Sequence, residues 1–151
     1  MKGRCAVGLA LAGLLAFAGT PAGADELHTE RSLYRNIVVY EDDGLRCMKF
    51  GRHAVGRQTC MSLADRDRLV FDYTRMMMAA LYLNPAPRRV LIIGLGGGTL
   101  PSALQKILPA AKIDAVEIDP AVVRVAEKYF GFVRGPQTEV FEEDGRVFVK
   151  R

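Results

Sequence analysis

The sequence is poor in the side chains that bind metal ions. It has only two histidines, His28 and His53, and none of its three cysteines belongs to a CxxC pair. Sites for zinc and related metals need clusters of such residues at short spacing. We therefore predict that the protein has no metal site.

The sequence also lacks a strong excess of one charge. Of the 21 basic residues, Lys2 and Arg4 belong to an amino-terminal segment that we expect to be removed, which leaves 19 basic against 17 acidic residues, or +2. A balance this weak gives no sign of the positive field that nucleic acids attract. We predict no nucleic-acid partner.

No apolar run in the chain is long enough to cross a membrane comfortably. The run from Cys5 to Gly19 has about 14 apolar residues, whereas a spanning helix needs about 20. It follows a basic start and precedes the small residues 22–24, which are typical of a cleavage site. We predict a signal peptide over 1–24, cleaved after Ala24, and a periplasmic or secreted protein without a stable membrane span. The alternative is a membrane anchor formed by an uncleaved signal.

Two cysteines, Cys47 and Cys60, follow that segment. In an oxidising compartment they could form one disulfide, but two buried free thiols are at least as compatible with their separation. The spacing alone leaves both alternatives open.

Residues 25–66 have the pattern of a small antiparallel β-domain. Ile37–Tyr40 and Leu45–Phe50 flank an Asp-Gly turn, which predicts a β-hairpin, and 57–61 predicts a further short strand. The polar residues 27–35 are expected to wrap onto the next element.

Residues 67–87 are expected to link two domains. Apolar residues recur at helical spacing over 68–83, which predicts an amphipathic helix with a buried methionine-rich face, and a binding groove is the alternative use of that face. The prolines Pro85 and Pro87 end the helix.

A glycine-rich turn organises the remaining residues, 88–151. An apolar run over 90–93, expected to be a short buried strand, leads into this turn, and a helical pattern and a second strand over 112–118 follow. Glycines allow positive φ and let main-chain N–H groups approach a ligand. The carboxylate of Glu117, 19 positions after Gly98, is placed to accept both hydroxyls of a ribose. This pattern predicts a nucleoside-binding βαβ unit.

The glycine spacing discriminates between nucleotides. A dinucleotide fingerprint, GxGxxG, would need glycine where Thr99 stands. Gly94, Gly96 and Gly98 instead give GxGxG, the form common in domains that bind S-adenosylmethionine and related sulfonium nucleosides.

Asp119 and Pro120 are suited to begin the next helix, and 138–141 to form a third strand. We expect the first half of a doubly wound sheet, and hence a fragment of a larger domain.

Four segments resemble the spermidine synthases and other polyamine aminopropyltransferases. They read ERSLYRNIVVYE, RVLIIGLGGGTL, VEIDPAVVRVAEKYFG and EDGRVFVK, and they extend over residues 30–151. The resemblance implies an α/β protein with a Rossmann-like S-adenosylmethionine-methyltransferase fold, incomplete here, after a small antiparallel β element.

The resemblance also implies which residues bind the co-substrate, decarboxylated S-adenosylmethionine or S-adenosylmethionine. Glu117 would hold the ribose and Ile118 the adenine face, while Asp144 with Gly145 would accept from the adenine amino group. The glycines beside the sulfonium end would be Gly94, Gly96 and Gly98.

The sequence departs from that family at several positions. The aspartate of the usual GGGDGG loop holds the amine of the aminopropyl group, and Gly97 stands in its place. Arg35 replaces a glutamine of the SxYQ motif, and Asp72-Tyr73-Thr74 replaces YHE. The family's general base lies beyond position 151, so no catalytic residue can be named.

Three functions are therefore weighed. The first is aminopropyl transfer from decarboxylated S-adenosylmethionine to a polyamine, and the second is methyl transfer from S-adenosylmethionine. The third is a non-catalytic nucleoside-binding module, so whether the chain is an enzyme stays open. A homo-oligomer is compatible with each of them.

Overall fold

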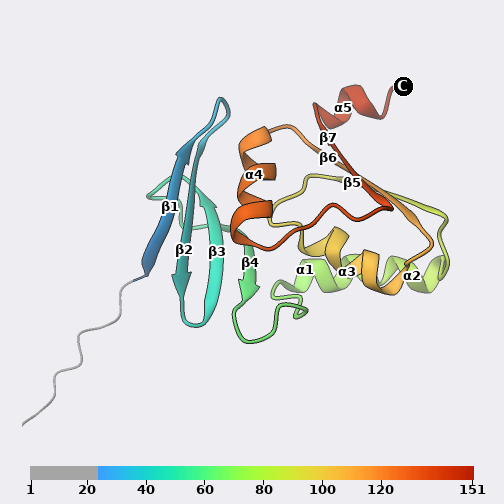
Figure 1. The fold of residues 1–151 in the computed structure, drawn as a ribbon, viewed down its shortest axis with the longest axis horizontal. Helices are drawn as coiled ribbons and strands as arrows, with labels where there is room; N and C mark the ends of the chain where they lie inside the picture. Colours follow the sequence, from blue (N-terminus) through green and yellow to red (C-terminus); the bar gives the residue numbers. More distant parts are fainter. Residues whose placement is uncertain (1–23) are drawn as a thin grey trace, which may run out of the picture.

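The computed structural model describes residues 24–151, which form two sheets (Figure 1). The first is antiparallel, with strands in the order β1-β2-β3-β4, and the second is parallel, in the order β5-β6-β7. The predicted signal peptide lies outside the described residues, apart from Ala24. The first sheet comprises β1 (Asp25–Arg31), β2 (Asn36–Asp42), β3 (Leu45–Phe50) and β4 (Arg57–Ser62).

The predicted hairpin and third strand of the first sheet are confirmed. Asp43 and Gly44 join β2 to β3 with φ of 48° and 70°, the positive values that a tight two-residue hairpin turn requires. The polar segment that was expected only to wrap onto its neighbour forms the additional edge strand β1. Its residues are mostly exposed, so it lacks the apolar alternation by which a strand is recognised.

A disulfide joins β3 to β4 through Cys47 and Cys60, which lie directly opposite each other. Both cysteines are buried, and Tyr40 and Phe71 pack around them. The structure therefore selects the disulfide from the two alternatives that the spacing left open.

The linking helix differs from its prediction. It begins at Asp72 and is divided into α1 (Asp72–Met78) and α2 (Ala80–Leu83). Met76 and Met77 are 74% and 50% exposed, so the expected burial of the methionine face was wrong. This helix has apolar residues on more than one side, and it packs against the core through Met78 and Leu81 instead of through Met76 and Met77. Neither this helix nor any other in the described part of the chain is long and apolar enough to span a membrane.

The parallel sheet consists of β5 (Arg89–Ile93), β6 (Lys112–Glu117) and β7 (Thr138–Glu142). Helices α3 (Thr99–Ile107) and α4 (Pro120–Tyr129) connect these strands. Both pack on the same face of the sheet, where Leu104 and Val123 meet Ile92, Ile113 and Val140 in one core. The sheet thus has the three consecutive strands expected of the first half of a doubly wound fold.

The opposite face of the parallel sheet is only partly covered. The short helix α5 (Gly145–Phe148) lies there, with Phe148 against Phe141. Leu91 and Ile93 on β5 point to this face and are 46% and 58% exposed, so the expected burial of that strand holds only for alternate residues.

Helix α4 joins the two sheets (Figure 1). Its residues Val122 and Val125 share a core with Ile37, Val39 and Met48 of the first sheet. Polar contacts also connect the first sheet with α4: Arg46 donates to the Tyr129 carbonyl at 2.7 Å, and Arg124 pairs with Glu30. This packing holds the first sheet beside the carboxyl ends of the parallel strands.

Candidate functional site

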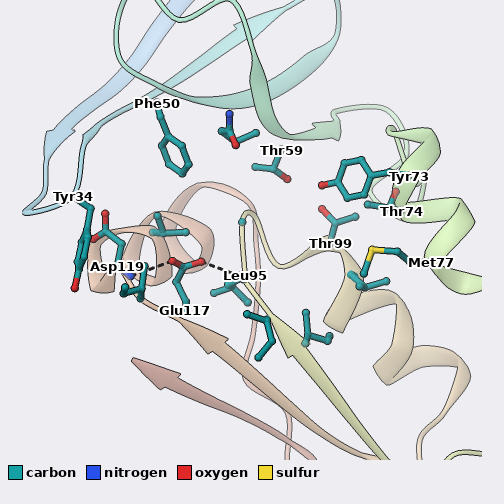
Figure 2. A pocket seen from close by; sticks show the side chains of 18 of the residues that line it. Tyr34, Phe50, Thr59, Tyr73, Thr74, Met77, Leu95, Thr99, Glu117 and Asp119 are labelled. Atoms are coloured by element: carbon teal, nitrogen blue, oxygen red, sulfur yellow. Dashed lines mark hydrogen bonds between the residues drawn. The ribbon is translucent and has the colours of Figure 1, made fainter. Parts of the chain in front are cut away.

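A pocket of about 350 Å³ lies between the two sheets, at the carboxyl ends of β5 and β6 (Figure 2). Open α/β sheets bind ligands at this edge, and the volume is in the range of small-molecule sites. One part of the wall comes from the first sheet, its loops and α1: Tyr34, Arg35, Phe50, Gln58, Thr59, Tyr73, Thr74 and Met77. The other part comes from the parallel sheet and its helices: Ile92, Ile93, Gly94, Leu95, Gly96, Thr99, Leu100, Glu117, Ile118, Asp119 and Val122.

The three glycines of the predicted motif have different surroundings. Gly94, Gly96 and Gly98 all have positive φ, of 94°, 58° and 75°. Gly94 and Gly96 line the pocket. A Cβ at Gly98 would lie 2.5 Å from the ring of Phe132, so this glycine allows close packing at the start of α3. The structure thus brings two of the three glycines to the pocket.

Glu117 is buried at the end of β6 and faces the pocket (Figure 2). Its Oε2 accepts a hydrogen bond from the Leu95 N–H at 2.9 Å, and its Oε1 accepts one from the Asp119 N–H at 3.1 Å. These bonds fix the carboxylate against the glycine loop. Each carboxylate oxygen can accept a further hydrogen bond, so the pair remains able to accept from a ribose diol.

Ile118 and Asp119 continue the same rim of the pocket. Ile118 is partly exposed and offers an apolar surface for a base. Asp119 begins α4 as predicted, because its Oδ1 accepts from the Ala121 N–H at 3.0 Å. Its Oδ2 accepts from the Ser32 hydroxyl at 2.5 Å, which ties the β1–β2 loop, and with it Tyr34, to the rim.

Asp144 and Gly145 are not among the pocket-lining residues. Asp144 caps α5, accepting from the Arg146 N–H at 2.7 Å and pairing with its guanidinium at 2.8 Å. Hydrogen bonds from the Arg146 side chain and backbone lower the pKa of Asp144 to about 2. A Cβ at Gly145 would lie 2.7 Å from the Ile93 side chain, so this glycine packs against β5. Their proposed contacts with adenine stay a prediction.

Gly97, which the resemblance matches to the acidic position of the family's loop, is closely packed. A Cβ at Gly97 would lie 2.9 Å from Thr59 Oγ1 and 3.1 Å from the Phe130 ring, so a larger residue would require these side chains to shift. A Cβ at Gly96 would meet nothing nearer than Thr59 Cβ at 3.7 Å, and Gly96 lines the pocket. The match of Gly97 to the acidic position stays a prediction.

Sequence reasoning missed the wall opposite Glu117. Phe50 and Thr59 lie across the pocket from Glu117, and Met77 lies at the end formed by α1 (Figure 2). Phe50 and Thr59 carry no motif, because they reach the pocket only through the packing of distant elements. Met77 belongs to the methionine-rich face for which a binding groove was the alternative use. The motif departures did give a signal for Arg35, whose guanidinium lies 4.7 Å from the centre of the Phe50 ring. The replacement of YHE by Asp72-Tyr73-Thr74 likewise pointed to Tyr73, which lines the pocket.

The pocket offers recognition groups of several kinds. Its titratable side chains are two carboxylates, two tyrosines and one arginine, beside threonine hydroxyls and apolar surface. Such a wall can hold a sugar by its hydroxyls and a base by its face. Within 24–151, no three side chains of His, Cys, Asp or Glu come together as potential metal ligands.

Comparisons with known proteins point to one family. The model of the spermine/spermidine synthase domain matches residues 62–151. A polyamine aminopropyltransferase of Vibrio vulnificus (strain CMCP6) is 46% identical over 127 residues, which is 83% of this chain and 42% of the relative. The chain thus spans less than half the length of that relative.

Two solved structures share the fold. A spermidine synthase in complex with the transition state analogue AdoDATO matches with a TM-score of 0.65 and 25% identity, over 83% of this chain and 43% of that chain. Human methyltransferase-like protein 13 in complex with SAH matches with a TM-score of 0.50 and 37% identity, over 53% of this chain and 39% of that one. These likenesses confirm the predicted Rossmann-like α/β fold of the methyltransferase type.

Proposed function

The chain belongs to the spermine/spermidine synthase family, and we propose that it supplies the nucleoside half of a site that transfers an aminopropyl group from decarboxylated S-adenosylmethionine to a polyamine. The observation that carries this proposal is the position of Glu117. Its carboxylate faces the pocket beside two positive-φ glycines, Gly94 and Gly96. This is the arrangement that a ribose and the adjoining sulfonium group would need.

The reaction breaks one carbon–sulfur bond and forms one carbon–nitrogen bond. The lone pair of an unprotonated acceptor amine attacks the carbon next to the sulfonium, methylthioadenosine leaves, and the new secondary amine loses a proton. The pocket would contribute by holding the nucleoside through Glu117 and Ile118, so that the electrophilic carbon is presented in a fixed position. No residue of the described chain is assigned as the base.

Methyl transfer from S-adenosylmethionine is a second candidate, which one observation favours. Gly97 stands where the family's loop has the aspartate that holds the amine of the aminopropyl group, so this chain has no carboxylate at that position. A charge-assisted hydrogen bond of this kind contributes about 1.5–3 kcal/mol. The human methyltransferase-like protein 13, whose fold is similar, was solved in complex with SAH.

Calorimetry distinguishes these candidates. We expect the chain to bind decarboxylated S-adenosylmethionine more tightly than S-adenosylmethionine. The reverse preference would favour methyl transfer instead. Absence of saturable binding by either ligand would overturn the proposed nucleoside site.

A pair of substitutions makes this test sharper. Gly97→Asp would restore the acidic residue of the family's loop once the Thr59 and Phe130 side chains shift, and we expect it to change selectivity toward the decarboxylated ligand by about tenfold. Gly96→Asp is the matched control, because it adds the same charge one position away, at a φ that aspartate tolerates, and should gain less selectivity. An unchanged preference in Gly97→Asp, with the fold intact by circular dichroism, would contradict the proposed position of the amine.

We also propose that the protein is exported. The buried disulfide between Cys47 and Cys60 supports this, because such bonds persist mainly in oxidising compartments. Amino-terminal sequencing of the protein from its native host should find Asp25 as the first residue. A reduced protein beginning at Met1 in the cytoplasmic fraction would overturn the proposal.

A further inference from the structure

A second cleft, of about 540 Å³, lies on the other side of the glycine loop from the nucleoside pocket. The β4–α1 connection, helix α3 and the segment after α4 form its walls. Gly97 and Thr99 belong to its lining, while Glu117 and Asp119 do not. The cleft is therefore separate from the two carboxylates that dominate the nucleoside pocket.

The charged side chains of this cleft are mainly cationic. Arg66, Arg68 and Lys106 line it together with a single carboxylate, Asp67, so these groups carry a net charge of +2. Lys106 pairs with Asp67. Within residues 24–151 neither Arg66 nor Arg68 has a carboxylate partner, whereas most other arginines there do. Two guanidinium groups are thus left without a counter-charge in the same cleft.

The backbone and α3 add to this arrangement. Gly131 has a φ of 68°, and a Cβ there would lie 3.0 Å from Nη1 of Arg66, so the absence of a side chain lets the guanidinium pack closely. Ser102, in the first turns of α3, adds a hydroxyl to the same wall, and so does Thr99. Guanidinium groups with hydroxyl donors beside them are the partners that phosphate oxygens prefer.

We propose that this cleft binds a small polyvalent anion of the phosphate class, with Arg66 and Arg68 as its main partners. The nucleoside pocket is unsuited to such a ligand, since its two carboxylates would repel an anion. The proposal rests on the cleft alone and holds whichever group the nucleoside site transfers. Occupancy would place a ligand against the rear of the loop that lines the nucleoside pocket.

Calorimetric titration of the full chain with inorganic pyrophosphate tests the site. We expect saturable binding that the double variant Arg66→Ala/Arg68→Ala weakens by about tenfold or more. The matched control is Arg31→Ala/Arg88→Ala, which removes the same charge from positions outside the cleft and should change affinity by less than about twofold.

Circular dichroism and thermal unfolding establish that each variant is folded. Equal weakening in both double variants would overturn the proposal, because general electrostatic attraction would then account for binding. Absence of saturable binding by the unmodified chain at millimolar pyrophosphate would overturn it as well.

Discussion

The carboxyl ends of β6 and β7 each lead to an acidic residue, but the two carboxylates have different partners. Glu117 accepts from two main-chain N–H groups, and one of them, on Leu95, belongs to the glycine loop 22 positions away. Asp144 is bound only to its own helix, through Arg146 two positions later. Glu117 therefore joins distant segments around a pocket, whereas Asp144 completes a local turn.

The loop glycines show the same contrast. Gly96 and Gly98 both have positive φ, but a Cβ at Gly96 would make only an ordinary contact with Thr59, at 3.7 Å. Gly98 is covered by Phe132. A residue type at the right spacing thus identifies a region, and its neighbours decide whether it serves a ligand or the packing of the fold.

Gly98→Ala should have the largest effect, on stability. The added methyl group would collide with the Phe132 ring and require a left-handed backbone, so we expect a loss of about 3 kcal/mol or more in the free energy of unfolding. Urea denaturation measures this loss. Gly96→Ala is the control, with only the backbone strain of about 1–2 kcal/mol. Equal losses for the two variants would remove the distinction between these glycines.

Glu117→Gln should have the next largest effect, on nucleoside binding. The amide nitrogen can accept no hydrogen bond, so the main-chain N–H of Leu95 or of Asp119, and the ribose hydroxyl on the same side, lose their acceptor. We expect the affinity for methylthioadenosine, measured by calorimetry, to fall by about tenfold or more. Glu142→Gln, at the exposed end of β7, is the control and should leave affinity unchanged. Unchanged affinity in Glu117→Gln would exclude a contact with the ribose.

Asp144→Ala should change the same affinity by less than about threefold, because this carboxylate lies outside the pocket lining and is already paired with Arg146. The resemblance to the aminopropyltransferases implies the opposite, a direct contact with adenine. A loss as large as that of Glu117→Gln would show that the start of α5 moves to meet the ligand.

The smallest effect concerns acid pH at the same cap. Hydrogen bonds from Arg146 hold the pKa of Asp144 at about 2, below the usual value of about 3.9. Because the folded pKa is lowered, the cap's contribution is complete above the usual value and is lost as pH falls toward 2. The NMR shift of the Arg146 amide should titrate with a midpoint near pH 2. A midpoint near 4 would mean that the cap does not form in solution.

Features set by interactions between near neighbours were predictable from the sequence. The hairpin turn at Asp43 and Gly44, the glycine loop after β5 and the cap at Asp119 each depend on residues a few positions apart. Each of these features can therefore be predicted from a short segment of the sequence. The same locality made the family recognisable from VEIDPAVVRVAEKYF.

The tertiary structure decided what such local patterns leave open. It placed Met77 in the pocket wall and not in the core, put Gly96 and not Gly97 in the lining of that pocket, and joined Cys47 to Cys60. Each of these outcomes depends on contacts between segments far apart in the chain, such as Thr59 against the glycine loop. The sequence by itself determined that a glycine loop would follow β5 and that an acidic residue would end β6, and packing of the first sheet through α4 determined which side chains enclose the pocket beside them.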